Sequence, residues 1–249
     1  MKHHRLIILS AFLPLVLSPS LSFAMHISEG ILPFSWALFW FVATVPFLAL
    51  GLRTLALRSK NDLSSKPLVG MVAAVVFVIS CMPIPVPLAG TCSHPCGTGL
   101  AAILLGPTLG VVVAAVALLI QALFLSHGGL STWGANLFSM GVLGSFGGYL
   151  IFRGLRVCRV NLVAAAFMAG VAADWATYAG TALIMAAGIR GDTAFWPLAG
   201  KIVLAFVPTQ LPLGIVEGAI TAGMISLLKR KRPDLLARTA LTGIERDQR

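Results

Sequence analysis

Long apolar runs dominate this chain and alternate with short polar or basic segments. After the first 24 residues, seven apolar segments follow one another, at about 36–53, 68–82, 98–106, 107–125, 134–152, 161–188 and 199–228. A helix needs roughly 20 apolar residues to cross a bilayer, and most of these segments approach that length. The pattern therefore predicts an all-α, polytopic membrane protein with about seven transmembrane helices.

The third segment is too short to cross a membrane alone at roughly 1.5 Å of rise per residue. Gly106-Pro107 separates it from the fourth segment, and proline interrupts a helix at such a point. We therefore expect two helices here rather than one long helix over 98–125. Lipid cannot satisfy the bare ends of a short helix, so the third segment is expected to pack inside protein.

The basic residues set the orientation, because cytoplasmic loops of membrane proteins carry an excess of Lys and Arg. They gather after the first segment (53–66), after the fifth (153–159) and in the tail from Lys229. With the N-terminus outside, seven passes place all three clusters in the cytoplasm. Merging the third and fourth segments into one helix over 98–125 would place the second cluster outside. We predict an outside N-terminus and a cytoplasmic C-terminus.

Composition agrees with this class and excludes others. Of the 249 residues, 58% are hydrophobic and 10% are charged, whereas soluble domains carry about 25% charged residues. The net charge of +10 arises from loop clusters without the basic-aromatic alternation of a nucleic-acid surface, so we expect no nucleic-acid partner. The surrounding lipid bilayer is the partner that the composition predicts.

The first 24 residues have the pattern of a secretory signal. A basic start is followed by an apolar run over 6–17, and Ser22-Phe23-Ala24 supplies the small residues of a cleavage site. The run is too short to span and is interrupted by two prolines, which argues against an uncleaved helix. We predict a signal peptide (1–24), a transmembrane metal-binding domain (25–228) and a basic cytoplasmic tail (229–249).

Cleavage after Ala24 would expose a free α-amine on Met25, directly followed by His26. The amine, the His26 amide nitrogen and a His26 imidazole nitrogen can form adjacent five- and six-membered chelate rings on one metal. These three nitrogens lie nearly in a plane, so a fourth, such as the imidazole of His94, would complete a square. Square-planar nitrogen coordination is typical of Ni(II) or Cu(II), and low-spin Co(II) also adopts it.

The loop containing His94 offers a rival site. Cys92, His94 and Cys96 could bind a softer metal through thiolates, or the two cysteines could pair as a disulfide in an oxidising compartment. His127, in a Ser-His-Gly-Gly sequence, is interpreted as an outer-loop residue rather than a ligand. From the sequence alone, the chelate, the thiolate site and the disulfide all stay open.

Three carboxylates lie in or beside apolar runs, and such groups are functional candidates by default. Glu29 follows the proposed chelate closely and could offset the charge of a metal or anchor the N-terminal strand. Asp174 and Glu217 could line a path, although bonds to neighbouring helices or backbone are the simpler interpretation. The chain contains neither a P-loop nor an H-E-x-x-H sequence, so we expect no ATPase or metalloprotease activity of its own.

Several spaced motifs together resemble the CbiM family, the substrate-specific components of energy-coupling factor transporters for cobalt, which has nickel-specific relatives. They comprise Met25–Gly30, with the order M-H-I-x-E-G, then Gly90–Leu100, Gln121–Gly141, Asp174–Tyr178 and Thr209–Gly218. The resemblance covers nearly the whole chain after residue 24. One departure is Cys96, at a position that the family usually fills with Thr.

The resemblance implies a function and a ligand set. Metal would be held by the amine of Met25, the amide and imidazole of His26, and the imidazole of His94. The supporting residues would be Glu29, Ser93, Thr98, Asp174 and Glu217. The chain would be a multi-pass protein of the cell inner membrane, with no permanent cofactor and with Co²⁺ (or Ni²⁺) as cargo.

The implied partners are a transmembrane coupling subunit, cytoplasmic ATPases and a small accessory membrane subunit, and the cobalt would serve cobalamin biosynthesis. The form of the loop around His94 favours cobalt over nickel. Two alternatives stay open, a nickel-specific subunit of the same transporter class and a permease driven by the metal gradient.

Overall fold

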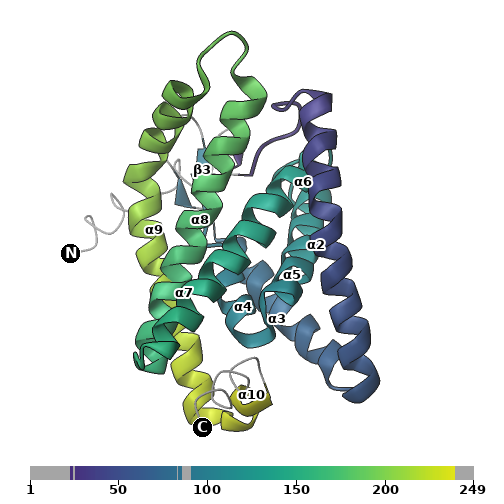
Figure 1. Cartoon of the computed structure of the whole chain (residues 1–249), viewed down its shortest axis with the longest axis vertical. Helices are drawn as coiled ribbons and strands as arrows, with labels where there is room; N and C mark the ends of the chain where they lie inside the picture. Colours follow the sequence, from purple (N-terminus) through teal and green to yellow (C-terminus); the bar gives the residue numbers. More distant parts are fainter. Residues whose placement is uncertain (1–22, 25, 83, 86–90, 239–249) are drawn as a thin grey trace, which may run out of the picture.

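The computed structural model describes residues 23, 24, 26–82, 84, 85 and 91–238, and the fold is a bundle of helices (Figure 1). In chain order the helices are α2 (Phe34–Asn61), α3 (Ser65–Ser80), α4 (Thr98–Leu105), α5 (Pro107–Phe124), α6 (Trp133–Asn136), the π-helical η1 (Leu137–Gly144), α7 (Ser145–Val157), α8 (Leu162–Ile189), α9 (Phe195–Lys231) and α10 (Pro233–Arg238). Three very short strands, β1 (Phe23–Ala24), β2 (Ile84–Pro85) and β3 (Thr91–Ser93), form one small sheet with β3 in the middle.

Each of the seven predicted apolar segments lies largely or wholly within a helix, with α6, η1 and α7 continuous over the fifth. In the described part of the chain, five helical stretches are long and apolar enough to cross a membrane: 34–61, 107–124, 133–157, 162–189 and 195–231. Helix α3 has 16 residues and α4 has eight. The multi-pass membrane class is therefore confirmed, while the number of crossings and their direction stay predictions.

The predicted interruption after the third segment is present. Helix α4 ends at Leu105, and α5 begins at Pro107. Gly106 joins them with a φ of 92°, a conformation that favours glycine, and its N–H still donates to the carbonyl of Ala102 at 2.9 Å. All eight residues of α4 are buried, as expected for a helix too short to face lipid.

Several helices are longer than the apolar segments that predicted them. Helix α2 continues past its apolar run through Arg58 and Lys60 in its last turn, and α9 ends with Lys229–Lys231. Cations are favourable at the C-terminal end of a helix, so these basic residues extend the helices rather than end them. Helix α9 also runs through Pro208 and Pro212.

Helices α8 and α9 approach closely through glycines. A Cβ atom added to Gly170 would lie 2.9 Å from the Cα of Gly218, and one added to Gly99 would lie 3.2 Å from the Cα of Gly170. Small residues allow this approach in membrane bundles, where packing rather than water exclusion holds helices together. As a result α4, α8 and α9 meet in the interior.

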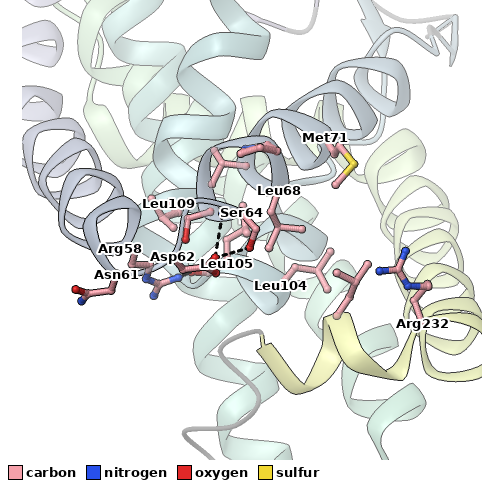
Figure 2. A pocket seen from close by; sticks show the side chains of 14 residues that line it. Arg58, Asn61, Asp62, Ser64, Leu68, Met71, Leu104, Leu105, Leu109 and Arg232 are labelled. Carbon is pink, nitrogen blue, oxygen red and sulfur yellow. Dashed lines mark hydrogen bonds between the residues drawn. The ribbon is translucent and has the colours of Figure 1, made fainter.

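The basic ends of the helices gather at one end of the bundle. The α2–α3 and α7–α8 connections and helix α10 all lie at the lower end in Figure 1. A cavity of about 530 Å³ opens there (Figure 2), and its lining includes Arg58, Leu105 and Arg232. Arg58 donates to the carbonyl of Leu105 at 2.8 Å and so satisfies the end of α4. Neither His nor Cys lines this cavity, which separates it from the predicted metal ligands.

Candidate metal site

The segment that carries His26 is held at the opposite end of the bundle from the basic residues. Asn136, in α6, accepts from the N–H of Ile27 at 2.8 Å and donates to its carbonyl at 3.1 Å. The hydroxyl of Thr132 donates to the same carbonyl at 2.5 Å. Because both backbone groups of Ile27 are bound, the preceding His26 is fixed in position beside the helices.

The small sheet brings the two predicted ligand segments together. Strand β1 pairs in parallel with β3, with Ala24 opposite Cys92. His26 and His94 each follow their strand by two residues or fewer. Residues that are 68 positions apart in the sequence thus lie side by side. After the predicted cleavage, which removes β1, the hydrogen bonds of Ile27 to Asn136 and Thr132 keep His26 at this place.

Three imidazoles meet at this point. Nitrogen atoms of His26, His94 and His127 all lie within 4.8 Å of one another, and the Nε2 atoms of His26 and His94 are 3.1 Å apart. His26 is 7% exposed and His94 is 1% exposed, and His127 is partly buried. We call these three residues the histidine cluster. Imidazole nitrogen suits divalent transition metals, so the cluster is the candidate metal site.

Hydrogen bonds decide which nitrogens can bind a metal. Nδ1 of His94 lies 3.0 Å from the carbonyl oxygen of Pro95, which can only accept, so the Nδ1 carries the proton and Nε2 keeps its lone pair. Nε2 of His26 lies 3.1 Å from Oε1 of Gln121. The amide of Gln121 is oriented by donating to the carbonyl and hydroxyl of Ser80. His26 thus keeps its lone pair on Nδ1, the nitrogen that a chelate with its own amide requires.

Two helices hold the loop that carries His94. The hydroxyl of Tyr178, in α8, donates to the carbonyl of His94 at 3.0 Å. The carboxylate of Glu217, in α9, accepts from the backbone N–H groups of Cys96 and Gly97, at 2.5 and 2.9 Å. Gly97 has a φ of 70°, which lets the loop turn directly into α4. Glu217 therefore acts as a backbone anchor, one of the two roles expected from the sequence.

The other predicted residues have separate places. Met25 lies outside the described residues. Glu29 accepts from the N–H of Ser131 at 3.2 Å, consistent with a role in anchoring the N-terminal segment. Ser93 is described only through its backbone in β3. Thr98 is fully buried at the start of α4, and Asp174 is fully buried in α8.

The structure places His127 beside both predicted imidazole ligands. It lies in a loop, as interpreted from the sequence, and its ring is 5.0 Å, between centroids, from the rings of both His26 and His94. Among the described residues its Nε2 has no hydrogen-bond partner. Two positive φ angles, at Ser126 and Gly128, turn the loop inward. Only the Ser-His-Gly-Gly sequence hinted at such a turn.

The structure contradicts the disulfide alternative and tests the thiolate alternative only through Cys96. Cys96 is a free thiol, so it does not pair with Cys92, whose side chain lies outside the described residues. Its sulfur is grouped with Asp174 and Glu217 rather than with His94. Among the described residues, the sulfur of Cys96 is therefore not part of the histidine cluster.

Burial keeps the imidazoles neutral. Desolvation lowers the pKa of His94 to about 4 and also lowers the pKa of His26 and His127, with repulsion from His94 as the second cause for His26. A neutral imidazole is the form that binds a metal. At neutral pH the cluster is therefore ready to bind a cation.

These pKa values predict a loss of stability in acid. Above pH 6.5 His94 is neutral in both states, but between pH 6.5 and 4 the unfolded chain takes up a proton that the folded chain does not. The melting temperature of the metal-free protein in detergent should therefore fall as pH drops through this window. The variant His94→Gln should show a smaller fall between pH 7.5 and 5, and an unchanged slope would contradict the assignment.

The apolar helices and the buried imidazoles together define an integral, multi-pass membrane protein with a candidate site for a transition metal. The family described as "CbiM: Cobalt uptake substrate-specific transmembrane region" matches residues 26–235. The chain therefore belongs to the CbiM family of cobalt-uptake membrane proteins. This is a family of transporters rather than enzymes.

Individual relatives agree with this assignment. A cobalt transport protein CbiM of Geobacter sulfurreducens is 64% identical over 229 residues, which cover 92% of this chain and 66% of that protein. One from Sorangium cellulosum is 55% identical over 86% of this chain and 95% of its own length. A crystal structure of a truncated transition metal transporter superimposes with a TM-score of 0.74 at 29% identity, covering 83% of this chain and 99% of that one.

Proposed function

We propose that the chain is the substrate-capture subunit of an energy-coupling factor importer for Co²⁺ in the cell inner membrane. The histidine cluster carries this proposal, because it offers neutral, buried imidazoles at the end of the bundle away from the basic residues. The positive-inside rule assigns that end to the outer side, from which an importer takes its cargo. The imported cobalt would supply cobalamin biosynthesis.

In this proposal Co²⁺ is held by four nitrogens in one plane. Three come from the amine of Met25, the amide of His26 and Nδ1 of His26, and the fourth is Nε2 of His94. The hydrogen bonds to Gln121 and Pro95 support this set, because they leave the lone pairs on Nδ1 of His26 and Nε2 of His94. Without metal, Nε2 of His94 faces Nε2 of His26 at 3.1 Å, a contact that the ion would replace. His127 lies beside both rings and would supply a further nitrogen in addition to these four.

The driving force comes from partner proteins. The sequence contains no P-loop, so ATP would be hydrolysed by cytoplasmic ATPases that act through a transmembrane coupling subunit, with a small accessory membrane subunit. Nickel is the alternative cargo, since Ni²⁺ accepts the same planar nitrogens. A gradient-driven permease is the alternative mechanism.

Transport in liposomes tests this proposal. The chain reconstituted with its coupling subunit and ATPases should accumulate Co²⁺ only with ATP, and the chain alone should accumulate none above empty liposomes. A catalytically inactive ATPase is the matched control. Uptake by the chain alone down a Co²⁺ gradient would contradict the proposal and support a permease, and preferential uptake of Ni²⁺ from an equal mixture would reassign the cargo.

A further inference from the structure

A second group of metal-binding side chains lies in the interior, apart from the histidine cluster. The sulfur of Cys96 and carboxylate oxygens of Asp174 and Glu217 all lie within 4.8 Å of one another. They come from the loop after β3 and from the interiors of α8 and α9. Each is at most 1% exposed. We call these three residues the carboxylate–thiol cluster.

The cluster has an unbalanced set of polar groups. Glu217 accepts two backbone N–H groups, whereas among the described residues Asp174 accepts no N–H or O–H group and has only the adjacent carboxylate of Glu217 as a partner. Among the described residues, no Lys, Arg or His forms an ion pair with either carboxylate.

An unpaired carboxylate in an apolar interior costs several kcal/mol, so two adjacent ones require a compensating positive charge. A proton shared between Asp174 and Glu217 would cancel one of the two negative charges. The thiol of Cys96 then has Thr177 and Tyr178 as hydrogen-bond partners. A metal ion bound by both carboxylates would also use the sulfur at the same point. The three converging donor atoms therefore define a candidate cation site, and a shared proton is the state that the carboxylates would have without the ion.

The donors indicate which cation. One sulfur and two carboxylates suit a borderline divalent transition metal, such as Co²⁺ or Zn²⁺, which binds Cys and Asp or Glu in four-coordinate sites. Calcium and magnesium prefer six or more oxygen donors and do not use sulfur. Burial, followed by repulsion from Glu217 and Asp174, raises the pKa of the Cys96 thiol, so a bound metal would have to displace its proton to solvent.

We propose that Cys96, Asp174 and Glu217 form a second binding site for a divalent transition-metal ion in the interior of the bundle. The loop of residues 94–97 connects this site to the histidine cluster, and Tyr178, one helical turn after Asp174, binds the carbonyl of His94. The role of this site as a second stop for imported cargo rests on the proposed function. Its ability to bind metal is independent of that function.

Cobalt spectroscopy tests the second site on the full chain. In a variant carrying Cys81→Ser, Cys92→Ser and Cys158→Ser, Cys96 is the only thiol among the four cysteines. Titration with Co²⁺ in detergent should give two bound ions per chain and a near-ultraviolet band of thiolate-to-cobalt charge transfer. Adding Cys96→Ser should remove the band and one of the two ions. The remaining ion, bound at the histidine cluster, would show that this variant is folded.

Two further variants separate this inference from the proposed function. His94→Ala in the same background should lose the other ion and keep the charge-transfer band. Asp174→Asn should weaken the Co²⁺ binding that produces the band by at least about tenfold, because losing a residue that only orients a ligand already costs roughly 10- to 100-fold. A single bound ion without the band would overturn the second site and leave the carboxylates sharing a proton. A band unaffected by Asp174→Asn would overturn the assigned ligands.

Discussion

Replacing His94 by alanine is expected to abolish high-affinity Co²⁺ binding at the histidine cluster. The variant removes one of four planar donors and leaves the chelate of the N-terminus without the nitrogen that closes the square. We expect the dissociation constant to rise on the order of 10³-fold, about 4 kcal/mol at 1.4 kcal/mol per tenfold change. Isothermal titration of the purified chain in detergent measures it, in the Cys96→Ser background so that only one site is counted.

Comparison with the other two imidazoles makes this prediction specific. His26→Ala should be at least as damaging, because His26 supplies two donors. His127→Ala should cost less than His94→Ala, because this ring lies outside the proposed plane. Gln121→Leu should weaken binding by roughly 10- to 100-fold, the effect typical of losing a residue that orients a ligand. Equal affinity of His94→Ala and the parent chain would contradict the proposed ligand set.

Extending the mature N-terminus is expected to weaken Co²⁺ binding to a similar degree. The amine of Met25 binds the metal only while His26 is the second residue, because the chelate rings are then five- and six-membered. Insertion of Ala-Pro between Ala24 and Met25 moves the amine two residues away. Proline at the second position has no N–H to lose, so the new terminus cannot replace the lost chelate.

The length of the insertion matters for this experiment. A single extra residue would place histidine third, where the amine, two amides and the imidazole form another four-nitrogen chelate. The matched control is the same Ala-Pro insertion after Asp192, in the exposed connection between α8 and α9. This control should bind Co²⁺ like the parent, whereas undiminished binding by the N-terminal insertion would exclude the amine as a ligand.

The helical fold could largely be predicted from the sequence, because hydrophobic length and charge act locally. Gly106-Pro107 predicted the separation of α4 from α5, and the structure has that separation. The lengths of α2 and α9 were underestimated, because basic residues are favourable at the C-terminal end of a helix and therefore do not mark the residue where the helix stops. The π-helical stretch 137–144 had no signal in the sequence.

The site was only partly predictable. His26 and His94 were proposed from chelate chemistry and from the family motifs. Their contact depends on the hydrogen bonds of Ile27 to Asn136 and Thr132, which lie 109 and 105 positions away and which no local pattern indicates. The position of His127 beside these two rings was not predicted, because the inward turn of its loop needs positive φ angles at Ser126 and Gly128. The group formed by Cys96, Asp174 and Glu217 joins three distant segments, and no local pattern indicates such a meeting.

The account depends most on a free amine at residue 25, and the intact mass of the chain purified from membranes tests it directly. Expressed without added residues at its N-terminus, the chain should have the mass of residues 25–249, and sequencing from the N-terminus should read Met-His-Ile. A chain that binds Co²⁺ with full affinity while residues 1–24 are still attached would contradict the account.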